Sequence, residues 1–173
     1  MTGGFAVTAG WDLPVEDPSQ VHAVVAMADA AVAHAGLSPA DRAACALVAT
    51  ELATNLARHA RQGRLVATAT EPGPAAWVQL AAVDRGPGIP DVGTAMADGY
   101  STTVSSLGGG LGACSRAAGA FDLYAAPGAG TVVVARIGPG CAPGSSPGSS
   151  PGGADGLAGV RVGGILSAQP GER

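Results

Sequence analysis

The sequence contains no lysine: all nine of its basic residues are arginine. Mechanisms that need a lysine amine, such as a Schiff base or the phosphate-binding lysine of a Walker A loop, are therefore excluded. Three cysteines are too few, and odd in number, for a disulfide scaffold, and they form no Cys-x-x-Cys pair. We interpret Cys45, Cys114 and Cys141 as small buried or incidental residues.

Aromatic residues make up only 3% of the chain, although the apolar share is 47%. Alanine and valine must therefore fill the core, and we expect modest stability unless a ligand or partner adds to it. The net charge is −4 and no basic stripe occurs, so we expect no nucleic-acid partner. No run of about 18 apolar residues and no charged signal-peptide start occur, so we expect a cytoplasmic protein without a membrane partner.

The 28 glycines and 13 prolines are unevenly distributed along the chain. They are most concentrated beyond residue 137, where Pro-Gly-Ser-Ser is repeated, so we predict a flexible linker over 138–156. The length before the linker allows one ordinary domain, residues 1–137. After the linker, residues 157–173 form a tail that includes a short alternating, strand-like stretch.

Hydrophobic spacing predicts an α+β order of elements in the domain. Ser38, Pro39 and Asp41 have the pattern of a capping box and so begin a helix. Because the helices are too few and too clustered for alternating βα units, we predict a two-layer sandwich, with one mixed β-sheet covered by helices on one face. Helices are expected over 18–35, 39–60 and 111–118, and strands over 5–9, 64–70, 76–84, 121–126 and 131–137.

Three short patterns suit nucleotide chemistry. Glu51 and Asn55 are four residues apart on a predicted helix and so share a face, with Arg58 beside them. Asp-Arg-Gly-Pro-Gly-Ile (84–89) ends a predicted strand. Gly-Gly-Gly-Leu-Gly (108–112) opens a predicted helix, whose N–H groups and dipole can hold phosphate. Taken singly, these patterns are also what a solvated helix face, a tight turn and a plain connection look like.

In this order the patterns resemble the N box, the G1 box and the G2 box of the GHKL ATPase superfamily, which has the Bergerat fold. Glu-Leu-Ala-Thr-Asn with Arg-His-Ala after it, Asp-x-Gly-Pro-Gly-Ile-Pro-Asp and Ser-Leu-Gly-x-Gly-Leu-Gly look like the RsbT-like anti-sigma regulatory serine/threonine kinases. The resemblance covers residues 5–137. The dimerisation helix with the phosphoacceptor histidine of histidine kinases is missing, so we interpret His22, His34 and His59 as ordinary helix-surface residues.

The resemblance implies an adenine-binding end of the site. Asp84 would accept a hydrogen bond from the exocyclic amine of adenine, which selects adenine because guanine has an oxygen at that position. Gly86 and Gly88 would let the backbone pass close to the base. Thr131, entering the last predicted strand, matches a threonine that this superfamily places near adenine.

The resemblance also implies a phosphate end, with ATP and Mg²⁺ as cofactors. Asn55 would offer a neutral oxygen to Mg²⁺, whose other ligands would be phosphates and waters. Arg58 would approach the phosphates, and Glu51 would take the proton from an attacking hydroxyl. A glycine-rich ATP lid, with residues 91–107, would close over the triphosphate through Gly108, Gly110, Leu111 and Gly112.

The leading functional hypothesis follows from the family: an anti-sigma regulatory serine/threonine kinase that transfers the ATP γ-phosphoryl to a serine. The implied substrate is a STAS-domain antagonist protein in a bacterial partner-switching stress response, with a phosphatase as a further partner. One alternative is an ATP-binding interaction module without turnover; Glu51 favours the kinase, since a binding module needs no base. The other comes from the tail, 157–173, which is similar to the start of SpoIIE-like PPM phosphatase domains and implies the regulatory ATPase half of such a protein.

Overall fold

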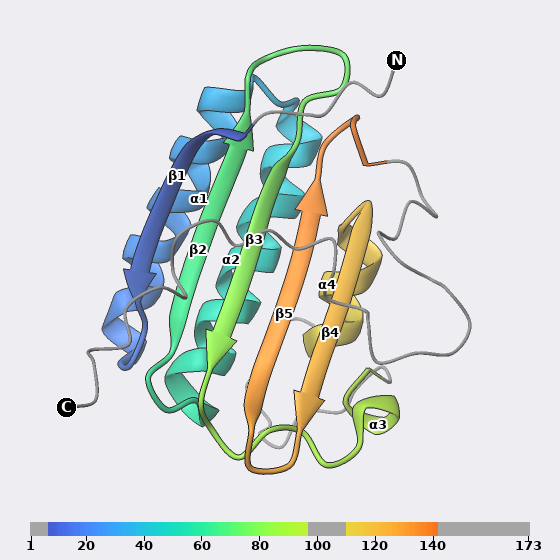
Figure 1. Cartoon of the computed structure of the whole chain (residues 1–173). Helices are drawn as coiled ribbons and strands as arrows, with labels where there is room; N and C mark the ends of the chain where they lie inside the picture. The colour runs from blue at the N-terminus through green and yellow to red at the C-terminus, as the bar shows by residue number, and fades with distance from the viewer. Residues whose placement is uncertain (1–6, 97–109, 142–173) are drawn as a thin grey trace, which may run out of the picture.

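The structure, a computed structural model, describes residues 7–96 and 110–141. These residues form the predicted two-layer α+β sandwich, with helices on one face of a five-stranded sheet (Figure 1). The elements are β1 (Val7–Pro14), the 3-10 turn η1 (Pro18–Gln20), α1 (Val21–Ala35), α2 (Pro39–His59), β2 (Arg64–Thr70), β3 (Val78–Asp84), α3 (Val92–Met96), α4 (Gly110–Ala117), β4 (Ala120–Ala126) and β5 (Gly130–Ile137). The strands lie in the order β1-β2-β3-β5-β4.

The predicted helices and strands are present, and the largest difference is at β1. This strand extends to Pro14 because it pairs with the whole of β2, with Val7 opposite Thr70 and Pro14 opposite Arg64. A short helix, α3, was not predicted in the glycine-rich segment that follows β3. Asp91 accounts for its start, since the Asp91 carboxylate accepts a hydrogen bond from the N–H of Thr94 at 3.0 Å.

The sheet corrects the prediction of mixed strand directions, because all four neighbouring pairs are antiparallel. The reason is how the chain returns between strands. Helices α1 and α2 run in opposite directions, so the chain comes back to the end where β1 finished, and β2 runs antiparallel to β1 (Figure 1). A single crossover helix would have made the two strands parallel.

The core lies between the sheet and the helices and consists mainly of small aliphatic side chains, as the composition predicts. The largest fully buried side chains include Leu52, Leu65, Leu80 and Ile137. All three cysteines are buried and free. Burial raises the pKa of the Cys45 and Cys114 thiols to about 12, so both remain neutral and pack as small apolar groups. None of the described helices is long and apolar enough to cross a membrane.

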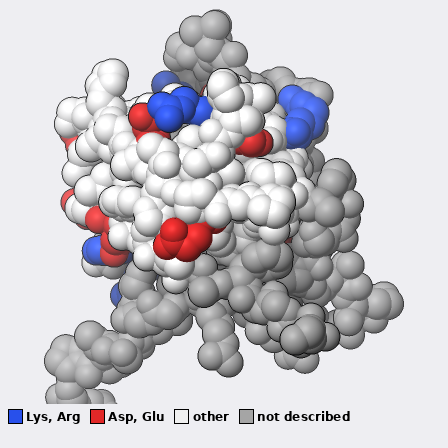
Figure 2. Space-filling view, turned by 90° about the horizontal axis from the view of Figure 1, so that it is seen from above, with Lys and Arg blue, Asp and Glu red and all other residues white. Residues whose placement is uncertain are grey.

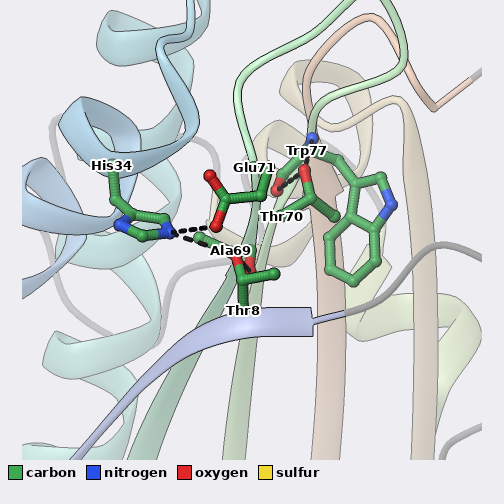
Figure 3. Close-up of polar contacts among 6 residues, drawn as sticks. All are labelled: Thr8, His34, Ala69, Thr70, Glu71 and Trp77. Carbon is green, nitrogen blue, oxygen red and sulfur yellow. Dashed lines mark hydrogen bonds and ion pairs between the residues drawn. The ribbon is translucent and has the colours of Figure 1, made fainter.

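Polar contacts at the upper end of the sheet join the first strand to the helix layer (Figure 3). The Thr8 hydroxyl lies 3.1 Å from Nε2 of His34, which is 4.0 Å from the carboxylate of Glu71. The backbone N–H of Trp77 donates to the hydroxyl of Thr70 at 3.0 Å. His34 therefore has a structural contact with an edge strand, beyond the helix-surface role expected of it.

Beyond β5 the structure describes only residues 138–141, the start of the predicted linker. The N–H of Gly140 donates to the carbonyl of Ala76 at 3.1 Å, and the N–H of Cys141 donates to the carbonyl of Gly138 at 3.0 Å. These contacts hold the first residues after β5 against the end of the sheet. Residues 142–156 of the predicted linker and the predicted tail, 157–173, lie outside the described residues.

The predicted capping box begins α2 and gives a first testable result. Ser38 Oγ accepts a hydrogen bond from the N–H of Asp41 at 3.2 Å, and the Asp41 carboxylate accepts one from the N–H of Ser38 at 3.3 Å. Ser38→Ala is expected to lower the free energy of unfolding by about 1 kcal/mol in urea denaturation. The control Thr50→Ala removes an exposed hydroxyl within the same helix and should not destabilise, because alanine is the better helix former. Equal losses would contradict the capping role.

Candidate functional site

A cavity of about 320 Å³ lies where the second half of α2 meets the end of β3, the start of β5 and the first turn of α4. This is the lower end of the sheet in Figure 1. Eight of the residues predicted from the sequence line it: Glu51, Asn55, Arg58, Asp84, Gly88, Gly110, Leu111 and Thr131. Gly86 and Gly112 are described but do not line the cavity, and Gly108 lies outside the described residues.

Helix α2 supplies one wall of the cavity. Leu52 and Leu56 are only 1% and 4% exposed, and their burial fixes the rotation of the helix. Glu51 and Asn55, one turn apart, therefore lie together along the cavity. Within the described ranges neither side chain has a hydrogen-bond partner, so their polar groups are free for a ligand.

Asp84 ends β3 and contributes the opposite wall. The N–H of Gly86 donates to Oδ1 of Asp84 at 2.6 Å, which fixes the direction of the carboxylate. Its second oxygen, Oδ2, accepts no hydrogen bond from the part of the chain that the structure describes. A Cβ on Gly86 would lie 2.7 Å from Oδ1 of Asp84 and 3.0 Å from the carbonyl oxygen of His59. Gly86 thus acts by positioning Asp84.

Two further glycines shape this end of the cavity by packing against backbone. Gly88 has a φ of +73°, and a Cβ there would strike the carbonyl of Ala126 at the β4–β5 turn. Gly130 has a φ of +91°, and a Cβ there would strike the carbonyl of Asp84. The close approach at Gly130 places the next residue, Thr131, directly opposite Asp84 in the β3–β5 pair. Thr131 and Asp84 therefore lie side by side on the cavity wall.

The carboxyl group of Glu51 has altered acidity. Burial raises its pKa above the ordinary value, and the positive charge of Arg58, two helical turns further on, partly opposes that rise. Arg58 itself is exposed at the edge of the cavity. A carboxylate with a raised pKa is a better proton acceptor once it is ionised, which suits a general base.

The sequence interpretation missed the apolar walls and one polar residue. The apolar part of the lining includes Ile89, Ala95 and Val133. His59, exposed at the end of α2, also lines the cavity, a position that its interpretation as a helix-surface residue did not include. The signal was present in the spacing, since His59 comes four residues after Asn55 and so lies on the same face of α2.

Comparisons with known proteins agree with this arrangement. The sequence profile of the histidine kinase-like ATPase domain matches residues 15–137, which contain the whole described lining of the cavity. The chain is also 33% identical over 100 residues to the serine/threonine-protein kinase RsbT of Bacillus subtilis (strain 168), covering 58% of this chain and 74% of that protein. The chain therefore belongs to the histidine kinase-like ATPase domain family, in which it is RsbT-like, as its motifs indicated.

Proposed function

We propose that the cavity binds ATP and that the chain is a protein kinase that phosphorylates a serine of a STAS-domain protein. The main observation behind this proposal is that Glu51 and Asn55 lie on one wall of the cavity and Asp84 lies on the other. The match to the ATPase domain family supports nucleotide binding, and the similarity to a serine/threonine-protein kinase supports the reaction class.

The Asp84 end suits the base of the nucleotide. Oδ2 of Asp84 is free to accept a hydrogen bond from the exocyclic amine of adenine, while Ile89 and Val133 offer apolar surface to a flat ring. A volume of about 320 Å³ lies within the range of small-molecule sites. Guanine would direct a carbonyl oxygen toward the carboxylate, so adenine is the favoured base.

Asn55 is the residue that would hold Mg²⁺. Its amide lines the cavity beside Glu51 and has no hydrogen-bond partner in the described chain, and oxygen is the donor that this hard cation prefers. The remaining ligands would come from phosphate oxygens and water. When bound, Mg²⁺ neutralises charge on the phosphates. Arg58 adds a second positive charge at the edge of the cavity.

Glu51 is the proposed general base. The serine hydroxyl attacks the γ-phosphorus of ATP, and the Glu51 carboxylate takes the hydroxyl proton. A bond forms between the serine oxygen and phosphorus, while the bond from phosphorus to the bridging oxygen breaks and ADP leaves with that electron pair. The products are a phosphoserine and ADP.

The proposal is tested with ATP labelled in its γ-phosphate. The purified chain is incubated with Mg²⁺ and STAS-domain proteins from the same genome, and the label is expected on a serine, located by mass spectrometry. Chelation of Mg²⁺ is expected to stop the transfer. Binding of ATP without any transfer would overturn the kinase proposal and favour the binding-module alternative.

The pH dependence of transfer gives a second test, through Arg58. Because the charge of Arg58 lowers the pKa of Glu51, its removal in Arg58→Gln leaves that pKa higher. The base acts only when ionised, so the acidic limb of the kcat profile is expected to move toward higher pH. Saturating ATP separates this shift from weaker ATP binding. Arg42→Gln, at an exposed site paired with Asp29, is the control and should leave the limb in place.

A further inference from the structure

Arginine and histidine side chains gather beside the cavity, at the turn after α2 and at the end of β3. Arg58, His59, Arg61 and Arg85 are all exposed, and we call these four residues the basic rim. The N–H of Arg85 donates to the carbonyl of Arg61 at 2.9 Å, so the two segments lie in contact. Arg58 and His59 also line the cavity, which makes the rim continuous with the candidate site.

Two members of the basic rim are not neutralised by the rest of the described chain. Arg61 and Arg85 form no ion pair or side-chain hydrogen bond with any residue in 7–96 or 110–141. Other exposed arginines differ, since Arg42 lies 2.7 Å from Asp29 and Arg64 lies 2.6 Å from Asp12. Although the net charge of the chain is −4, two arginines next to the cavity have no acidic partner within 7–96 and 110–141.

The opposite end of the molecule has no comparable concentration of positive charge in view. Figure 2 looks at that end from above and shows mainly uncharged surface, with acidic and basic side chains intermixed. One example of neighbouring opposite charges is the ion pair between Asp29 of α1 and Arg42 of α2. At the cavity end, Arg61 and Arg85 have no acidic partner among the described residues, and this is the end that a substrate has to approach.

We propose that the basic rim is the docking surface for an acidic segment of the protein substrate, an inference that rests on the proposed kinase function. Arginine binds carboxylates through paired hydrogen bonds, and unpaired surface charge speeds the association of an oppositely charged partner. Along α2, the eight residue steps from Glu51 to His59 span about 12 Å. An extended chain covers that length in about four residues. A segment held on the rim can therefore reach Glu51 with a nearby serine.

The first test measures binding without turnover. The probe is a fluorescent peptide of eight glutamates, and its affinity is measured by anisotropy at low salt with ATP present. The double variant Arg61→Gln, Arg85→Gln is expected to bind the peptide about fivefold or more weakly than the unchanged chain. The double variant Arg42→Gln, Arg136→Gln removes the same charge far from the rim and should bind normally. Equal binding by the two variants, no binding by the unchanged chain, or tighter binding of an equally charged single-stranded oligonucleotide would overturn the proposal.

The second test uses the transfer reaction with the STAS-domain substrate. The rim variant is expected to raise KM for the protein substrate about fivefold or more, with kcat and KM for ATP unchanged, and added salt should reduce the difference. An unchanged KM for the protein, with transfer intact, overturns the rim proposal and leaves the proposed function standing. Absence of transfer in the unchanged chain instead overturns the proposed function, whereas the peptide experiment still decides whether the rim binds acidic chains.

Discussion

Replacing Glu51 by glutamine is expected to lower phosphoryl transfer about 100- to 10,000-fold, with ATP affinity nearly unchanged. Glutamine keeps the size of the side chain but cannot take a proton from the attacking hydroxyl. Because no described residue hydrogen-bonds the Glu51 side chain, the substitution breaks no such contact and should leave the cavity intact. Transfer is measured with labelled ATP at saturation, and ATP affinity by calorimetry.

The control is Glu16→Gln, an exposed glutamate near the start of the chain that does not line the cavity. This variant should transfer phosphate at the normal rate. If Glu51→Gln also transferred at the normal rate, another group would have to be the base, although the kinase proposal would survive. If Glu51→Gln lost ATP binding together with transfer, the residue would be part of the binding site, and its assignment as base would lose its support.

Local patterns were enough to predict most of the fold. The capping box at Ser38 and the strand predicted over 64–70 each depend on neighbours in sequence, and both elements occur where they were predicted. Strand direction was mispredicted because it depends on how two successive helices return the chain, which no short stretch of sequence records. The full extent of β1 likewise depends on a partner strand that is distant in sequence, as in the pairing of Pro14 with Arg64.

In the candidate site too, helical spacing in the sequence predicted some features, and others depend on packing between segments that are distant in sequence. Helical spacing correctly placed Glu51 and Asn55 together. Glycine patterns indicated a tight site, but the structure gives some of those glycines other neighbours. Gly86 faces the carboxylate of Asp84, and Gly88 faces the carbonyl of Ala126. The atom that a missing Cβ would strike belongs to a distant segment, so sequence spacing alone does not reveal it.

Asp84→Asn is expected to weaken ATP binding about 10- to 100-fold, the range for losing a hydrogen bond to a charged acceptor in a partly buried site. The effect follows from the fixed direction of the side chain. The N–H of Gly86 donates to Oδ1 at 2.6 Å, so in the variant the amide oxygen must occupy that position. The amide NH₂ then takes the place of Oδ2 and directs a donor at the exocyclic amine of adenine, which is itself a donor.

The same geometry predicts a change in base preference. Such a change is expected if Asp84 contacts the base directly, and it is not expected if the substitution only disrupts the cavity. Inosine triphosphate has a carbonyl oxygen where adenine has its amine, and the new amide donor can pair with it. The ratio of ATP to inosine triphosphate affinity should therefore fall sharply in Asp84→Asn. Asp122→Asn, on the exposed face of β4, makes the same chemical change away from the cavity and should leave the ratio unaltered. Equal losses for both nucleotides in Asp84→Asn would show that Asp84 does not contact the base. If ATP binding were not weakened at all, the proposal that ATP binds in this cavity would be wrong.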